Sequence, residues 1–146
     1  LTADTDSDTV RTGVSRGAYV VSDSDQPRVL LLATGSEVSL ALAAAATLEA
    51  DGIGTRVVSM PCLEWFDAQE PAYRDSVLLP SVRARVAVES GATLGWYRYV
   101  GDDGRVIGLD HFGASADQAT LFREFGITVE SIGAAARSSI AAADRD

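Results

Sequence analysis

Two amino acids are absent from this sequence and three others occur only once. There is no lysine and no asparagine, and the single cysteine, histidine and methionine are Cys62, His111 and Met60. Without lysine, Schiff-base catalysis, a pyridoxal phosphate anchor and a P-loop lysine are excluded. One cysteine excludes an intrachain disulfide and a zinc site built from cysteines, and it fits a reducing, cytoplasmic compartment.

The chain also lacks long apolar runs and has fewer positive than negative charges. No apolar stretch approaches the ~20 residues of a membrane span, and residues 1–6 have neither the basic nor the apolar part of a signal peptide. The 12 basic residues, all arginine, face 21 acidic residues, which gives a net charge of −9. This charge repels nucleic-acid backbones and anionic membranes, so we expect neither as a partner.

What is present describes one globular domain. The 146 residues are 47% hydrophobic and 23% charged, and a chain of this size buries roughly two-thirds of its unfolded surface without a staple. Because the chain opens on Leu1 and its only methionine is Met60, we expect a piece of a longer polypeptide. Abundant alanine and arginine beside the missing lysine and asparagine predict a GC-rich bacterial source.

The hydrophobic pattern divides the chain into an arm and a domain. Residues 1–27 are polar and show no sustained period, which predicts an arm or linker from a preceding domain, with a short strand at 18–21. Residues 28–146 form the predicted domain. Its first strand is the apolar run 29–33, which is typical of burial on both faces.

The remaining elements follow from periodicity and from start and stop signals. Ser36 predicts the N-cap of a helix that ends near Gly52. The short helical crossover to the next strand implies parallel pairing. The other expected elements are strands 55–59 and 85–88, helix 66–75, extended segments 96–100 and 105–109 around the turn 101–104, a helix opened by a capping box from Ser115 to Gln118 and ended at Gly126, a short strand 127–129, and a final helix 132–143. Strands alternating with helices predict a three-layer α/β/α sandwich.

One candidate binding site is the turn formed by Thr34, Gly35 and Ser36. It lies where a parallel strand passes into a helix N-terminus, whose backbone N–H groups and dipole can hold a phosphate or a carboxylate. The glycine-rich phosphate motif is missing, however, and Glu37 already places negative charge there. A structural turn and cap is the favoured interpretation, and a small-anion site is the alternative.

The remaining chemical groups are better explained without catalysis. His111 follows Asp110, but adjacent residues on an extended chain point to opposite faces, so a loop histidine near an interface is favoured. Cys62 would need a neighbouring base to act as a nucleophile, and a packed thiol is favoured. The acidic residues are scattered and predict no metal site. Core packing or an interface to another domain explains the aromatic residues Trp65, Phe66, Trp96, Tyr97 and Tyr99.

Several phrases in order resemble the C-terminal domain of transketolases, over about residues 15 to 143. Asp117 departs from the family pattern, which usually has proline after Ser-Ala, and this moves the helix start towards capping-box chemistry. The matching phrases are SRGAYV (15–20), ATGSEV (33–38), RVVSMP (56–61), FDAQ (66–69), YRDSVL (73–78), RARVAVE (83–89), WYRYVG (96–101), FGASA (112–116) and LFREFG (121–126).

The resemblance implies a mixed, mainly parallel five-stranded sheet with helices on both sides. It also implies a three-domain homodimeric parent enzyme of the pentose phosphate pathway, which moves two-carbon ketol units between ketose and aldose phosphates with thiamine diphosphate and Mg²⁺. In the family the cofactor lies between the first two domains, so no catalytic, cofactor-binding or metal-binding residue maps onto this chain. The turn 101–104 is superficially similar to the start of the thiamine diphosphate motif, but a chain without asparagine cannot complete that motif.

Three functional hypotheses follow. The first is a non-catalytic structural and assembly domain whose partners are the preceding transketolase domains and the second subunit of the homodimer. The second is a regulatory module that binds a small anion or a sugar phosphate at Thr34, Gly35 and Ser36. The third is one part of a split thiamine-dependent enzyme. The parent protein is expected to be an enzyme, and this chain alone is not.

Overall fold

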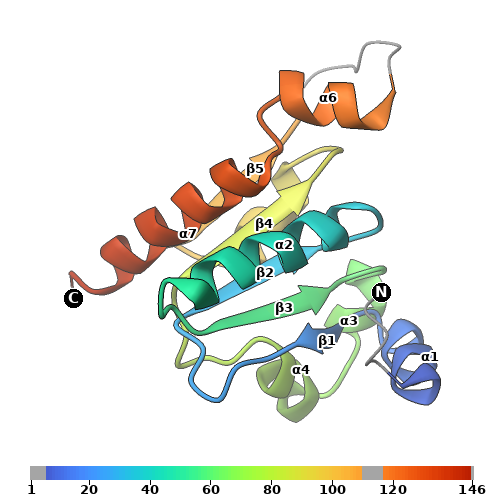
Figure 1. Cartoon of the computed structure of the whole chain (residues 1–146). Helices are drawn as coiled ribbons and strands as arrows, with labels where there is room; N and C mark the ends of the chain where they lie inside the picture. The colour runs from blue at the N-terminus through green and yellow to red at the C-terminus, as the bar shows by residue number, and fades with distance from the viewer. Residues whose placement is uncertain (1–5, 110–116, 146) are drawn as a thin grey trace.

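The computed structural model describes residues 6–109 and 117–145, which form a central sheet with helices on both of its faces (Figure 1). The elements in chain order are α1 (Ser7–Ser15), β1 (Tyr19–Ser22), β2 (Val29–Ala33), α2 (Glu37–Ala50), β3 (Thr55–Ser59), α3 (Leu63–Asp67), α4 (Pro71–Val77), β4 (Arg85–Glu89), the 3-10 turn η1 (Leu94–Trp96), α5 (Tyr97–Val100), β5 (Arg105–Gly108), α6 (Gln118–Glu124) and α7 (Val129–Ala143).

The sheet is mixed and mainly parallel, as predicted. Its strand order is β1-β3-β2-β4-β5. β2 pairs in parallel with β3 and with β4, and β4 pairs in parallel with β5. β1 is an edge strand and runs antiparallel to β3. The helical crossover through α2 therefore joins two parallel neighbours, which confirms the pairing expected from the sequence.

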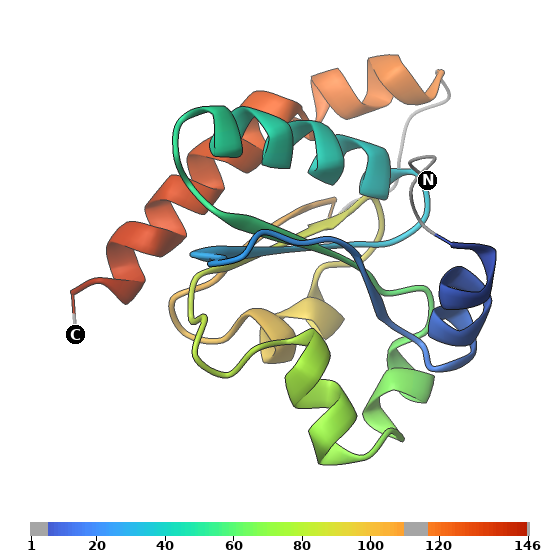
Figure 2. The same cartoon turned by 60° about the horizontal axis from the view of Figure 1, so that its bottom comes forward.

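Alternate residues of the central strands pack into two separate hydrophobic cores, one on each face of the sheet. Leu31 of β2 lies in the core below α2 and α7, whereas Leu30 and Leu32 lie in the core that packs against α3, α4 and α5. The period of two residues along a strand places successive side chains on opposite faces of the sheet. Figure 2 shows the resulting three layers, with α2 and α7 on one face and α3, α4 and α5 on the other. The predicted three-layer sandwich is confirmed.

The segment 96–100 is helical, and its prediction as a strand is wrong. Trp96 and Tyr99 are only 3% and 6% exposed, and both belong to the core beneath the sheet. Residues three apart share a face of a helix but not of a strand, so burying both rings favours helix over the strand propensity of aromatic residues. The predicted strand at 105–109 is confirmed as β5.

Two helices replace the single one predicted over 66–75. Pro71 occupies the first turn of α4, and Glu70 before it has an extended backbone (φ −59°, ψ 146°). A residue that precedes proline is driven out of the helical region, and proline fits well at a helix start. The chain therefore breaks after α3 and begins again at Pro71.

The start of α7 corrects the strand predicted at 127–129. The backbone N–H of Ser131 donates to the Thr128 hydroxyl, and the Thr128 N–H donates to the Ser131 hydroxyl, at 3.1 and 3.0 Å. This reciprocal capping box ends the extended backbone at Thr128 and starts the helix at Val129. Ile127 is buried in the core, as its apolar character requires.

Another cap was predicted from Ser115, which lies outside the described residues. α6 begins at Gln118, and the Asp117 carboxylate accepts from both the backbone N–H and the hydroxyl of Thr120, at 3.0 and 2.7 Å. These hydrogen bonds hold the pKa of Asp117 below its usual value. The residue that departs from the family pattern therefore caps the helix itself.

The polar arm contains a helix that the sequence did not predict. α1 precedes β1, whose position agrees with the strand predicted at 18–21. Gly13 packs directly on the Tyr19 ring, where any side chain at position 13 would overlap it. The domain boundary at residue 27 stays a prediction, although β1 contributes a strand to the sheet.

Candidate functional site

The turn of Thr34, Gly35 and Ser36 connects the carboxyl end of β2 to α2, as predicted. Gly35 has a positive φ of 57°. The N–H groups of Glu37 and Val38 donate to the carbonyls of Thr34 and Gly35, so these two donors are already used within the turn. Ser36 stands at the N-cap position, but its side chain makes no capping hydrogen bond to the backbone. Its hydroxyl instead donates to Glu37 Oε2 at 3.3 Å.

Glu37 is the residue of this turn whose role the sequence did not reveal. It is only 3% exposed, and its Oε1 is buried without a hydrogen-bond partner among the described residues. Its Oε2 lies 3.6 Å from the position that a Cβ on Gly35 would take. A carboxylate so close to the turn repels a phosphate, which weighs against the small-anion site at Thr34, Gly35 and Ser36. That site stays a prediction.

The turn lies at a reversal of the sheet topology. From β2 the chain crosses one face through α2 to β3, whereas from β4 it enters η1 and α5 on the opposite face (Figures 1 and 2). Ligands of open α/β sheets bind at the carboxyl ends of the strands where this reversal occurs. Here the end of β4 is also acidic. Glu89 Oε1 accepts from Gly91 N–H at 2.8 Å and Oε2 from Trp96 Nε1 at 3.3 Å.

Neither Cys62 nor the turn 101–104 has the neighbouring groups that catalysis would need among the described residues. Cys62 precedes α3, and its Sγ lies 3.5 Å from Glu64 Oε2 with no histidine among the described residues. In the turn 101–104, Asp103 pairs with Arg83 at 2.5 Å, in agreement with a turn. Asp110 and His111 lie outside the described residues.

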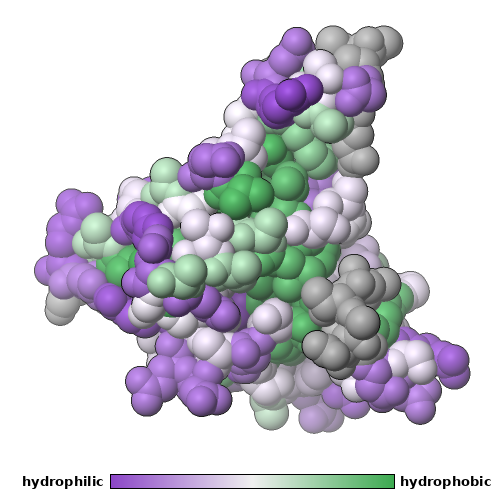
Figure 3. Space-filling view, viewed as in Figure 1, coloured by the Kyte–Doolittle hydropathy of each residue, from purple (hydrophilic) through white to green (hydrophobic). Residues whose placement is uncertain are grey.

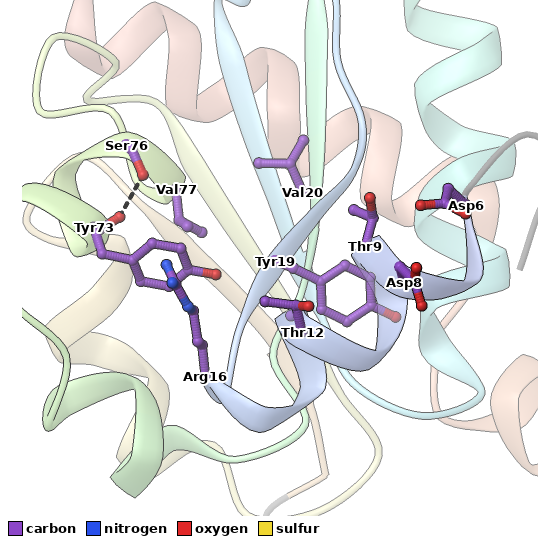
Figure 4. A pocket seen from close by; sticks show the side chains of 11 residues that line it. Asp6, Asp8, Thr9, Thr12, Arg16, Tyr19, Val20, Tyr73, Ser76 and Val77 are labelled. Atoms are coloured by element: carbon purple, nitrogen blue, oxygen red, sulfur yellow. Dashed lines mark hydrogen bonds between the residues drawn. The ribbon is translucent and has the colours of Figure 1, made fainter.

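Two clefts were not predicted from the sequence. The first, of about 470 Å³, lies between α1, β1 and α4 (Figure 4). In it the Arg16 guanidinium stacks 4.6 Å from the centre of the Tyr73 ring, and the Tyr73 hydroxyl donates to the Ala18 carbonyl at 2.7 Å. Burial raises the pKa of Tyr73. The matched phrases 15–20 and 73–78 contain these residues, but only the unpredicted helix α1 completes the cleft.

A second cleft, of about 640 Å³, is lined by Arg85, Arg98 and Tyr99 among other residues. Arg98 pairs with Asp67 and donates to the Tyr99 hydroxyl at 2.6 Å, and that hydroxyl donates to Asp67 Oδ1 at 2.9 Å. The Arg85 guanidinium donates to four backbone carbonyls, those of Leu78, Leu79, Val82 and Tyr99. Asp67, Arg85 and Arg98 are therefore engaged in holding α3, α4 and α5 together.

We expect the pKa of Tyr99 to lie well above the usual value of a tyrosine. Its burial, together with the hydrogen bond to Asp67, raises its pKa to about 12. A raised tyrosine pKa favours the neutral, folded form, so this contribution to stability is complete below pH 10 and is lost as the pH rises through about 12. Tyr99→Phe should flatten the fall in stability above pH 10, as measured by urea unfolding. The control Tyr97→Phe removes a hydroxyl from a ring that is 56% exposed, and an equal flattening in both variants would contradict the assignment.

Comparison of the chain with known protein families gives a match over most of its length. Residues 17–128 match the family model described as the transketolase-like TK C-terminal domain. The chain belongs to this family. It is 53% identical over 134 residues to the transketolase of Mycobacterium tuberculosis (strain ATCC 25618 / H37Rv), which covers 88% of this chain and 19% of the relative. The chain therefore spans about a fifth of the length of the curated transketolases that it matches.

Solved transketolase structures share the fold. The transketolase from Leishmania mexicana superposes with a TM-score of 0.81 and 42% identity, over 89% of this chain and 19% of that one. A chain described as a split gene transketolase, inactive beta4 tetramer, has a TM-score of 0.65 with 22% identity, over 87% of this chain and 43% of that one. At that identity the second match supports the fold alone. Within the part of the chain that the structure describes, no helix is both long and apolar enough to cross a membrane.

Proposed function

We propose that this chain is the non-catalytic, assembly-forming C-terminal domain of a transketolase. The observation that carries the proposal is the match of nearly the whole chain to only about a fifth of each relative, within the family of C-terminal domains. In this proposal the parent enzyme moves two-carbon ketol units between ketose and aldose phosphates in the cytoplasm, within the pentose phosphate pathway. Its partners are the preceding domains of the same polypeptide and the second subunit of a homodimer.

The residues that the structure describes do not fit thiamine diphosphate and Mg²⁺. Mg²⁺ takes oxygen ligands and is usually held by carboxylates together with phosphate oxygens. Asp103 is engaged by Arg83, and no group of three or more His, Cys, Asp or Glu side chains in the described residues could hold a metal ion. At the carboxyl edge of the sheet, Glu37 and Glu89 would oppose a diphosphate. We therefore assign the cofactor to the domains that precede this one.

A ketol-transfer assay tests the proposal. Three samples are compared with thiamine diphosphate and Mg²⁺ present: this chain, a polypeptide of the preceding transketolase domains, and the two mixed in equal amounts. We expect no turnover by this chain alone, and we expect the two polypeptides to co-elute as one complex in gel filtration. Turnover by the chain alone would overturn the non-catalytic assignment, and failure to form a complex would overturn the assembly role.

The gene upstream of this chain distinguishes a single polypeptide from a split enzyme. If the reading frame upstream of the chain continues into the preceding transketolase domains, the chain is a domain of one polypeptide. If a separate gene encodes those domains, the chain is one part of a split enzyme with the same assembly role.

A further inference from the structure

We propose that the buried carboxyl group of Glu37 receives a positively charged side chain, an arginine or a lysine, from the transketolase domains that precede this one. The inference rests on the proposed assembly function and names the chemistry of its contact. The proposed contact lies at the carboxyl edge of the sheet, where β2 ends and α2 begins.

The first support is the missing partner of Glu37. A buried polar atom of a native protein nearly always has a hydrogen-bond partner, and leaving one without a partner is costly. Oε1 of Glu37 has none among the described residues, whereas Oε2 accepts from the Ser36 hydroxyl. Residues 1–5, 110–116 and 146 contain no arginine or lysine. A guanidinium or an ammonium group for Oε1 therefore has to come from another part of the protein.

The second support is the path of the chain. Tyr19 at the start of β1 pairs with Ser59, the last residue of β3. The chain therefore enters the sheet at the carboxyl ends of the parallel strands, and α1 lies on this side of the molecule (Figure 1). Whatever precedes α1 in a full-length relative approaches the domain from the edge where Glu37 is buried.

Exposed apolar side chains on the same edge provide the third support. Trp65 of α3, Leu94 of η1 and Tyr97 of α5 are 55%, 84% and 56% exposed, and their helices follow the carboxyl ends of β3 and β4. Hydrophobic residues also gather around the start of α2, between α6 and α1 (Figure 3). Exposed aromatic residues are typical of a protein interface, where arginine is enriched as well.

The charge of the edge selects the kind of group that binds. Glu37 begins α2 after the end of β2, Glu89 is the last residue of β4, and the chain has a net charge of −9. An anion is repelled at this edge, and a divalent ion lacks a third acidic or histidine ligand among the described residues. A positively charged side chain therefore suits this edge, and the planar guanidinium of arginine can donate two hydrogen bonds to one carboxylate.

The test compares Glu37→Gln with the wild-type chain in binding to the polypeptide of the preceding domains. Glutamine keeps the shape and removes the charge, so we expect the dissociation constant to rise about tenfold or more in calorimetry. Glu49→Gln on the exposed side of the same helix is the matched control and should bind like wild type. Trp65→Ala, at an exposed position, should also weaken binding without changing the fold.

The outcomes separate this inference from the assembly role. If the wild-type chain does not bind the preceding domains, the assembly role itself fails. If the wild type binds and Glu37→Gln binds equally well, the charge contact is refuted while the assembly role stands. His111 is the one basic side chain outside the described residues, and His111→Ala tests whether it is the partner of Glu37. If it weakens binding as much as Glu37→Gln and the two effects are not additive, His111 is the partner and the inference is overturned.

Discussion

Arg56→Met is expected to lower the free energy of unfolding by about 2 to 4 kcal/mol. Arg56 is 9% exposed. Its Nε and Nη2 donate to the two carboxylate oxygens of Asp23 at 2.9 and 2.6 Å, and Nη1 donates to the carbonyls of Ser76 and Val77. One guanidinium thus joins β3 to the β1–β2 connection and to the end of α4. Methionine fills much of the space but leaves four acceptors without their donor.

The measurement for Arg56→Met is urea unfolding followed by circular dichroism. Arg137→Met is the matched control, because its ion pair with Asp51 is exposed, with 45% and 55% of the two side chains accessible. An exposed pair contributes about 0 to 1 kcal/mol. Equal losses in the two variants would show that the buried position of Arg56 adds nothing to its contribution.

Gly17→Ala is expected to destabilise the fold by about 2 to 5 kcal/mol, from a left-handed backbone together with overpacking. Gly17 has a φ of 85° at the end of α1. A Cβ there would overlap the Cys62 carbonyl oxygen and the backbone of Trp65 and Phe66. Backbone atoms cannot turn aside as a flexible side chain can, so α3 would have to move away from the α1–β1 junction.

The control for this substitution is Gly52→Ala. Gly52 has a similar φ of 79°, but a Cβ there meets nothing within 4 Å. Gly52→Ala should lower the free energy of unfolding by only about 1 to 2 kcal/mol, the cost of alanine in a left-handed backbone conformation. The difference between the two alanine variants, measured by thermal unfolding, isolates the close approach of α3. If both variants lose the same stability, the contact at Gly17 has no energetic weight.

The strand 29–33 could be predicted because burial on both faces gives a continuous apolar run, and α2 because Ser36 and Gly52 are start and stop signals of a helix. The run 29–33 is apolar throughout, and all five of its residues are buried in β2. The helical segment at Trp96 and Tyr99 could not be predicted in the same way. Its aromatic residues suit a strand as well as a helix, and only their packing below the sheet decides between the two.

For the candidate site too, local features could be predicted from the sequence and features that depend on the tertiary fold could not. The sequence correctly placed the turn of Thr34, Gly35 and Ser36 between a strand and a helix, because glycine and serine are local signals. It did not reveal that Glu37 is buried, with one oxygen that has no partner in the described part of the chain, since burial depends on segments far away in the sequence. The exposure of Trp65, Leu94 and Tyr97 also depends on the tertiary fold.

Titration of thiamine diphosphate into this chain in the presence of Mg²⁺ tests the assignment to an assisting domain most directly. Isothermal calorimetry at concentrations that saturate a complete transketolase should give only the heat of dilution, because no cluster of His, Cys, Asp and Glu side chains in residues 6–109 and 117–145 suits a diphosphate-bound metal. Saturable one-to-one binding to the 146-residue chain would contradict the account.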